Sequence, residues 1–357
     1  MFGQGRLLNY EFVTKVRIVF ALLVILGVFW NHPVQAPTNN PTGNLPLAPE
    51  RLKEISIIAV GDILLSRQVG KKIDQSENPN LPFEKLQATL SGADLTFGNL
   101  ECPLDSGSNP IREGLIFRCL TKYVPGLVTA GFDVLSTANN HAMDQGLDNL
   151  KFTREYLRSQ NILPIGSAAS LDEAWQPQIL QRNGTKFAFL AASYASINDN
   201  GKTTNDYVAR IEDLEHLKAS ILKLKSQADF IIVNMHAGTE YTSHPNQKQI
   251  AFAHAAIDAG ADVVIGQHPH WIQDIEIYQN KPIFYSLGNF VFDQMWSQET
   301  REGLVVRLAI SDKRLEKAEL IPVIIENYCC PRLASDEEKS KILKKIRLEA
   351  ATIEFAK

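Results

Sequence analysis

The chain has few cysteines, no long run of basic residues and no apolar run of full membrane-spanning length. With 36 basic and 40 acidic residues its formal net charge is −4, so nucleic-acid binding has no electrostatic support. The four cysteines stand in no recognisable nucleophile context, which argues against a catalytic thiol. The composition, 45% hydrophobic and 21% charged residues over 357, is typical of a globular protein with a sizeable core.

The sparse cysteines leave the disulfide pattern open. Cys102 and Cys119 are candidates for a bridge that would hold Glu101 in place in an exported protein. Free buried thiols are the alternative, because four cysteines allow three connectivities and the sequence does not choose among them.

An apolar run near the N-terminus, residues 18–30, follows Arg6, Lys15 and Arg17. It is shorter than the roughly 20 residues of a membrane span but typical of a signal-peptide core. Pro37, directly after a small-residue cleavage sequence, would hinder a signal peptidase. We therefore expect residues 1–30 to be a signal anchor in the cell membrane with the bulk of the chain outside the cytoplasm. A cleaved, secreted form is the alternative.

The remainder divides by composition. Five prolines among residues 31–50 predict an extended tether. The folded domain is expected at residues 51–334, without an internal repeat. Residues 335–355 predict a helix with a capping box, Ser335 and Glu338, so that residues 335–357 form a C-terminal helix.

Strand and helix patterns alternate along the domain, and three hairpins interrupt them. Helices are expected at residues 66–73, 147–159, 214–226 and 247–259. The hairpins are expected at residues 178–191 around Asn183-Gly184, at 275–285 and at 303–325. This mixture predicts an α/β fold with two mixed β-sheets packed as a sandwich between flanking helices.

Five polar segments each follow an apolar run that reads as a strand. They are Gly61-Asp62, residues 98–101, residues 139–144, Met235-His236 and residues 266–270. In open α/β sheets, ligands bind beyond the carboxyl ends of the strands. Because Asp, Glu, Asn and His can meet there, the sequence predicts a site for one or two divalent metal ions.

The five segments differ in how specific they are. In His268-Pro269-His270 the two imidazoles of an extended segment point to the same side, which makes this the strongest local pattern. His236 follows a buried strand and alone would often be a core histidine. Beside the other four polar segments, we interpret it as a metal ligand. Asp144 could orient a nearby imidazole, and it could also cap the helix that follows.

Six ordered motifs resemble the capsule synthesis protein CapA family. They are AVGD (59–62), GNLE (98–101), ANNHAMDQG (138–146), HAGTEY (236–241), GQHPH (266–270) and YSLGNFVFDQ (285–294). Members of that family take part in making poly-γ-glutamate, and the family belongs to a wider group with a calcineurin-like metallophosphoesterase fold. The resemblance covers essentially the whole folded domain.

The resemblance implies a role for each matching residue. Asp62 and His270 would hold one metal, Asn140, His236 and His268 a second, and Glu101 would bridge them. His141 would be the general acid, supported by Asp144. The ions would be Mn, Fe, Zn or Mg. Candidates for substrate binding or for support of the site are Arg118, Glu240, Tyr241 and Asn289, with Asp293 beside the last.

Two positions depart from the wider group. Leu64 stands where its first motif has a histidine, and Gln267 intervenes after Gly266 in its last motif. The first metal site therefore lacks one expected ligand, and a mononuclear site would lack the two-metal clamp on a phosphoryl group.

Two functions of different classes remain. The favoured one is a membrane-tethered, metal-dependent hydrolase that cleaves a phosphoester or amide bond of an anionic cell-surface polymer or its precursor. The alternative is a non-catalytic subunit that binds metal or polymer within a membrane capsule-synthesis complex. A secreted nucleotidase or phosphodiesterase unrelated to capsule is a weaker third.

Overall fold

The computed structural model describes residues 54–107, 116–194 and 206–355. All described residues belong to one compact unit, residues 51–357. The expected signal anchor and tether lie outside the described residues. Among the helices of the described ranges, none is both long and apolar enough to cross a membrane.

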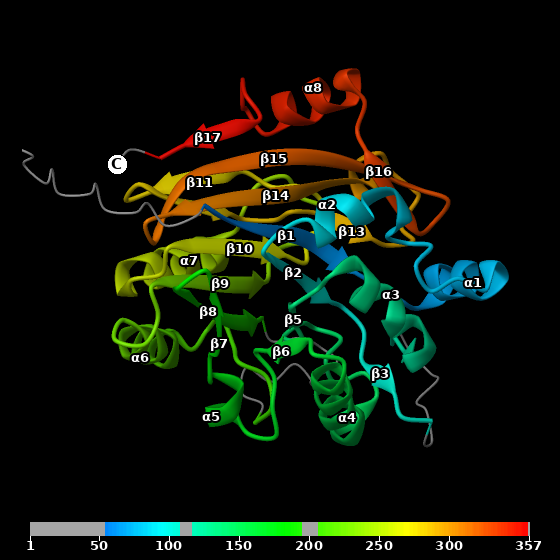
Figure 1. The fold of residues 1–357 in the computed structure, drawn as a ribbon, viewed down its shortest axis with the longest axis horizontal. Helices are drawn as coiled ribbons and strands as arrows, with labels where there is room; N and C mark the ends of the chain where they lie inside the picture. The colour runs from blue at the N-terminus through cyan, green and yellow to red at the C-terminus, as the bar shows by residue number, and fades with distance from the viewer. Residues whose placement is uncertain (1–53, 108–115, 195–205, 356–357) are drawn as a thin grey trace, which may run out of the picture. The chain divides into compact units, whose positions relative to one another are not determined.

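The first sheet has nine strands and is mixed (Figure 1). Its parallel half consists of β1 (Ile55–Ile63), β2 (Leu95–Leu100), β5 (Val134–Ser136) and β6 (Leu163–Ile165), with β13 (Asn289–Val291) also parallel to β1. Its antiparallel half consists of β14 (Glu302–Ser311), β15 (Arg314–Glu326), β16 (Cys330–Leu333) and β17 (Thr352–Glu354).

The second sheet has six strands in the order β11-β12-β10-β9-β8-β7. Its parallel centre is β8 (Thr185–Ser193), β9 (Phe230–His236), β10 (Val263–Gln267) and β12 (Lys281–Phe284). The antiparallel edges are β7 (Gln178–Arg182) and β11 (Ile275–Tyr278). A separate two-stranded ribbon pairs β3 (Leu104–Asp105) with β4 (Cys119–Leu120).

Helices cover the outer face of each sheet. Those packed on the first sheet are α1 (Arg67–Ser76), α2 (Gln87–Ser91), α3 (Val124–Ala130) and α4 (Gly146–Ser159). Those packed on the second are α5 (Leu171–Ala174), α6 (Leu214–Leu224) and α7 (Gln247–Ala259). The last helix, α8 (Asp336–Lys345), contacts β15. Short 3-10 turns lie at Glu84–Leu86, Thr121–Tyr123 and Glu299–Arg301.

Three apolar cores hold these layers together. Along β1, Ile57 and Ala59 face the core between the sheets, where they meet Phe189 and Ile232 of the second sheet. Ile58, next in sequence, belongs instead to the core beneath the helices of the first sheet. Successive side chains of a strand alternate between its faces, so a strand covered on both sides must be apolar at nearly every position. The expected four-layer α/β sandwich is confirmed.

All three predicted hairpins are present, and each turns in two residues. Asn183-Gly184, Gln279-Asn280 and Asp312-Lys313 all have positive φ at both positions. That is the geometry of the type I′ turn, whose backbone twist matches that of the strands. In the first pair both residues are types that favour it, whereas in the other two pairs only Asn280 and Asp312 are.

Several element boundaries differ from expectation. The polar segments do not all follow their strands, because β1 runs past Asp62 to Ile63, β2 extends to Leu100, and β9 and β10 end at His236 and Gln267. The C-terminal helix keeps its capping box but ends at Lys345, and the prediction of a helix to residue 355 is wrong. There the chain turns at Arg347 (φ 61°), and β17 pairs with β15. The backbone bonds of an open sheet edge outweigh the local helix preference.

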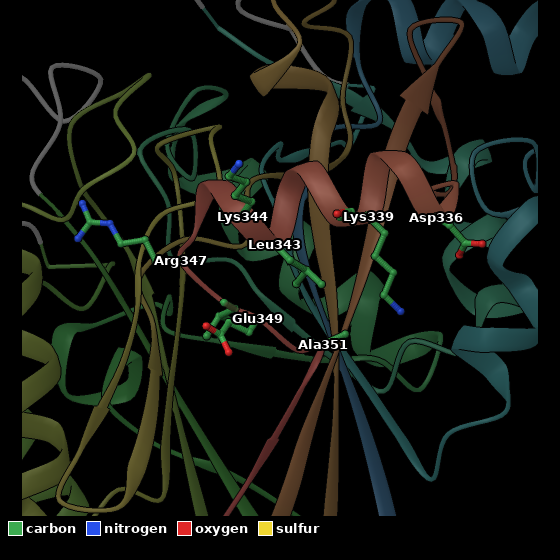
Figure 2. Close-up of a pocket in the computed structure, with 9 residues that line it drawn as sticks. Asp336, Lys339, Leu343, Lys344, Arg347, Glu349 and Ala351 are labelled. Atoms are coloured by element: carbon green, nitrogen blue, oxygen red, sulfur yellow. The ribbon is translucent and has the colours of Figure 1, made fainter.

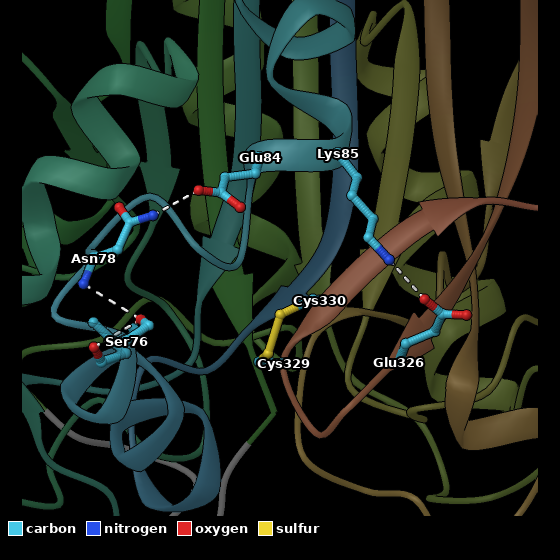
Figure 3. Close-up of a disulfide and its surroundings, with 8 residues drawn as sticks. Ser76, Asn78, Glu84, Lys85, Glu326, Cys329 and Cys330 are labelled. Carbon is cyan, nitrogen blue, oxygen red and sulfur yellow. Dashed lines mark hydrogen bonds and ion pairs between the residues drawn. A yellow bond between two sulfur atoms is a disulfide. The ribbon is translucent and has the colours of Figure 1, made fainter.

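Cysteine pairing also differs from the bridge considered above. The disulfide joins the neighbours Cys329 and Cys330 at the start of β16, close to an ion pair between Lys85 and Glu326 (Figure 3). Cys102 and Cys119 are free, buried thiols, which was the alternative. Burial raises the pKa of the Cys119 thiol, and the adjacent Cys102 adds to this.

Candidate metal centre

The parallel strands of both sheets point the same way (Figure 1), and the polar residues gather at their carboxyl ends. The first sheet supplies Asp62 from β1 and Glu101 directly after β2. The second supplies His236 at the end of β9, with His268 and His270 after β10. All five side chains are at most 4% exposed.

These five residues form two groups that share one carboxylate. Glu101, His236 and His268 offer ligand atoms within 4.8 Å of one another, and so do Asp62, Glu101 and His270. A carboxylate common to two clusters is the arrangement that a pair of divalent ions requires of a bridging ligand. The bridging role of Glu101, implied by the family resemblance, stays a prediction; among the described residues Glu101 is the one that occurs in both groups.

A buried hydrogen-bond network fixes the Asp62 side of the site. The Asn99 side chain donates from Nδ2 to Asp62 Oδ1 (2.8 Å), and the same Nδ2 lies 3.1 Å from His236 Nδ1. The backbone N–H of His268 donates to Asp62 Oδ2 (3.1 Å). Asn99 therefore joins a carboxylate of the first sheet to an imidazole of the second.

Gly61 lets β1 come close enough for this network. A Cβ atom there would lie 1.9 Å from the carbonyl oxygen of Gly288. The backbone N–H of Asp62 donates to that same oxygen (3.1 Å). Any larger residue at position 61 would push Asp62 out of place.

Two amide side chains contact the histidines. Asn140 Oδ1 lies 2.8 Å from His236 Nε2, which places it beside the group of Glu101, His236 and His268. Asn289 Oδ1 lies 2.9 Å from His270 Nδ1 and is fully buried. Asn289 thus orients His270, because its Oδ1 contacts a ring nitrogen of that imidazole.

His141 adjoins the cluster and is held from two sides. Its Nδ1 lies 2.7 Å from Asp144 Oδ2, and its ring stacks on Phe117 with 3.7 Å between centroids. The backbone N–H of Phe117 donates to the same Asp144 oxygen. His141 Nε2 then faces inwards, 3.9 Å from Glu101 Oε1.

Burial dominates the electrostatics of the site. It raises the pKa of Asp62 to about 7 and that of Glu101 well above its usual range, the latter with help from the charge of Asp62. It lowers the pKa of His270 to about 3 and holds those of His236 and His268 far below their usual range. Without a further positive charge, the site therefore favours neutral carboxyls and neutral imidazoles.

The residues fit divalent ions on an independent observation. Both carboxylate oxygens of Glu101 and Nδ1 of His268 are buried, and none of the three has a hydrogen-bond partner among the described residues. Such atoms destabilise a fold unless something else satisfies them. Carboxylates, imidazoles and an amide oxygen are donors that suit Zn, Mn or Fe, and a cation between them would remove the penalty.

Residues 56–294 match the model of a protein family described as "Bacterial capsule synthesis protein PGA_cap". The chain belongs to this family. It is 32% identical over 292 residues to the "PGA biosynthesis protein CapA" of Bacillus subtilis, covering 81% of this chain and 76% of that protein. It is 28% identical over 349 residues to the "Capsule biosynthesis protein CapA" of Bacillus anthracis, covering 95% of this chain and 82% of that protein.

Among solved structures, this PGA_cap protein is similar to the calcineurin-like phosphoesterase YfkN of Bacillus subtilis. The TM-score is 0.44 and the identity 12%, over 83% of this chain and 97% of that chain. A hypothetical protein from Thermus thermophilus gives a TM-score of 0.48 at 14% identity, over 75% of this chain and 98% of that one. Neither likeness carries information about the activity of the PGA_cap chain.

The two residues that depart from the phosphoesterase motifs, Leu64 and Gln267, are both buried in this PGA_cap chain. Leu64 is fully buried in the core beneath the helices, and its backbone N–H donates to Val291. Gln267 is also fully buried, accepts a hydrogen bond from Asn234 and donates from Nε2 to the carbonyl of Val60 (3.3 Å). Gln267 thus connects β10 to β1. In the group of Asp62, Glu101 and His270, where the motif histidine is replaced by Leu64, Glu101 is the third side chain.

The other residues predicted to bind substrate differ in how close they lie to the metal-ligand candidates. Tyr241 packs near His270, with 5.9 Å between ring centroids, and its hydroxyl accepts from Gln294. Glu240 is exposed, and its charge contributes to the raised pKa of Glu101. Arg118 directs its Nε towards Asp105 Oδ2 (3.4 Å), so its guanidinium is engaged by Asp105.

Three contributors were not assigned a role from the sequence: Asn99, Phe117 and Arg67. Asn99 lies two residues before Glu101, so strand alternation places both side chains on the same side of β2. The spacing in the sequence therefore predicts that Asn99 lies near the site. Phe117 and Arg67 stand outside every motif, and their approach to the site depends on how loops pack.

One surface hollow lies away from this cluster. It has a volume of about 770 Å³ and is lined by α8 and the segment that leads to β17, including Lys339, Lys344, Arg347 and Glu349 (Figure 2). It shares no residue with the predicted metal and catalytic residues.

Proposed function

We propose that this protein is a metal-dependent hydrolase of capsule biosynthesis, acting on a phosphoester or amide bond of an anionic polymer or its precursor. The observation that supports it most is the pair of groups sharing Glu101 next to the His141–Asp144 dyad. The substrate class follows the names of the two relatives, which assign them to PGA and capsule biosynthesis. The N-terminal apolar run would hold the chain at the outer side of the cell membrane.

Each residue would have a distinct task. Asp62, Glu101 and His270 would hold one ion, and Glu101, His236 and His268, with Asn140 beside them, the other. The ions, when bound, supply Lewis acidity that lowers the pKa of water and neutralises developing negative charge. His141 would donate its Nε2 proton to the leaving group, while Asp144 holds the imidazole in the required orientation. The burial of the cluster would keep bulk water away from the reacting bond.

One observation favours the second candidate, a non-catalytic subunit that binds metal or polymer. Leu64 takes the place of a ligand, so one group has only three side chains to offer. Three protein ligands with an open position are also what catalytic sites have, and this leaves the hydrolase as the preferred proposal.

The test is elemental analysis of the purified full chain, read with hydrolysis of a simple phosphodiester and of a γ-glutamyl amide. Near-stoichiometric Mn, Fe or Zn together with turnover that His141→Ala abolishes supports the hydrolase. Metal without turnover on either substrate favours the binding subunit. Absence of metal after careful reconstitution contradicts both forms of the proposal.

A further inference from the structure

Arg67, the first residue of α1, is held in an unusual conformation next to the candidate metal centre. Its φ of 50° lies in the left-handed region, which a side chain other than Gly, Asn or Asp adopts at a cost. Such strain persists only where the surroundings impose it, and it gathers at functional sites. The contacts of the guanidinium identify those surroundings.

Two aromatic rings and one carboxylate fix the guanidinium. Its carbon lies 4.7 Å from the ring centroid of Phe117 and 5.6 Å from that of Phe292. Asp293 accepts from Nε (3.1 Å) and from Nη2, and its Oδ2 also accepts from the backbone N–H of Gln68. An arginine held this way has lost its freedom to rotate before any ligand arrives.

The fixed guanidinium is partly open to solvent. The side chain of Arg67 is 35% exposed, whereas that of Asp293 is 7% exposed. Among the residues that the structure describes, none accepts a hydrogen bond from Nη1. A pre-oriented arginine with an open donor edge matches the oxygens of a carboxylate or a phosphate.

Arg67 lies close to the proposed catalytic residues. Phe117 contacts both Arg67 and His141, the residue placed to act as the acid. Phe292 likewise contacts both Arg67 and His270, with 4.8 Å between its ring centroid and that of the imidazole. A group bound at Nη1 would therefore lie beside a bond positioned at the metal cluster.

We propose that Arg67 is a substrate-binding residue that holds an oxyanion substituent, carboxylate or phosphate, next to the bond that is cleaved. This inference rests on the proposed function and adds to it the subsite that recognises negative charge. Arg118, the arginine suggested by the sequence, is engaged by Asp105 and does not take this role.

The test compares binding of two separate probes, inorganic phosphate and γ-glutamyl-glutamate, to the full chain by calorimetry, with and without Mn. Arg67→Met removes the donors and keeps an apolar stem against the rings, and Arg67→Lys keeps the charge without the fork. Arg182→Met is the matched control, because Arg182 is also 35% exposed and pairs with a carboxylate, Asp133, at 2.8 Å.

We expect Arg67→Met to weaken binding of at least one probe about tenfold or more, the effect of losing charge-assisted hydrogen bonds. Arg67→Lys should weaken it less and Arg182→Met should leave it unchanged. The probe that loses more affinity identifies the substituent as carboxylate or phosphate. Equal binding by wild type and Arg67→Met, or no binding of either probe by the wild type, overturns the inference. Failure to hold Mn contradicts the proposed function instead, and the metal-free titrations still decide on Arg67.

Discussion

Asp144 Oδ2 lies 2.7 Å from Nδ1 of His141, and this contact turns Nε2 of the imidazole towards Glu101. The two residues are three positions apart in a turn before α4, where Asp144 also accepts from the backbone of Phe117. One carboxylate thus fixes both the imidazole and the ring stacked on it. Glu101, directly after β2, and the His141–Asp144 pair, in the turn before α4, thus come from separate segments and meet here.

For His141→Ala we expect a loss of turnover of about 10²-fold or more, the usual contribution of a general acid, with unchanged metal content. For Asp144→Asn we expect a loss of about 10–100-fold. Turnover and elemental analysis of the same preparations provide the measurement. Asp213→Asn is the control, because Asp213 makes the same contact with His216, 2.6 Å and three residues apart, on the surface. A similar loss of turnover in the control would contradict the claim that Asp144 acts by orienting His141.

Glu101→Gln should change stability in opposite directions with and without metal. In the metal-free protein, burial penalises the charged carboxylate, so the neutral amide should raise the free energy of unfolding at pH 8 by on the order of 1–3 kcal/mol. In the metal-loaded protein the same change removes a shared ligand and should lower it. Urea unfolding of both proteins in Mn and in EDTA measures the four values. Destabilisation of the same size in both conditions would show that Glu101 is structural.

The metal-free protein should become less stable as pH rises from about 6.5 to 8. The folded state keeps protons on Asp62, with a pKa of about 7, and on Glu101, which the unfolded chain has lost because its carboxyl pKa values are near 3.8 and 4.5. When the folded state binds more protons, the free energy of unfolding falls with rising pH. Below about 6.5 the buried histidines act in the opposite direction, because the unfolded chain protonates them more readily.

Urea unfolding at pH 6.5 and pH 8.0 after EDTA treatment measures this dependence. The combined Asp62→Asn, Glu101→Gln variant should have a flatter profile. With metal present the slope should reverse, since metal ligands bind in their deprotonated forms. A metal-free protein whose stability increases over this interval would contradict the assignment of two neutral carboxyls.

Thiol counting tests the cysteine pattern. The denatured, unreduced protein should present two reactive thiols and the reduced protein four. Peptide mapping should find Cys102 and Cys119 alkylated and the disulfide within the peptide that contains Cys329. A cross-link between Cys102 and Cys119 would restore the bridge that the sequence suggested.

Much of the fold follows from local sequence patterns. The helix at Gln247–Ala259 and the hairpin at Asn183-Gly184 were predicted because periodicity and turn chemistry are strong there. Short elements such as β3, β13 and β17 were not, since two or three residues carry no periodicity and pair only because distant strands leave an edge open. The same pairing of β17 explains the wrong extension of the last helix.

The site divides along similar lines. The carboxyl-end rule brought Asp62, Glu101, His236, His268 and His270 together because it concerns the ends of long, clearly patterned strands. Their assignment as ligands stays a prediction. The roles of Arg67 and Phe117 could not be reached, because they depend on loop packing between segments far apart in sequence.

Each of the two groups combines candidate ligands from both sheets, Asp62 and Glu101 from the first and the three histidines from the second. An ion bound in either group would link the two sheets, because it would be bonded to side chains of both. Neither sheet could retain it alone, so separation of the sheets and release of the ions would be a single event. The strand ends nearest the ions should then exchange their amide hydrogens only by global unfolding, while the free edges open locally.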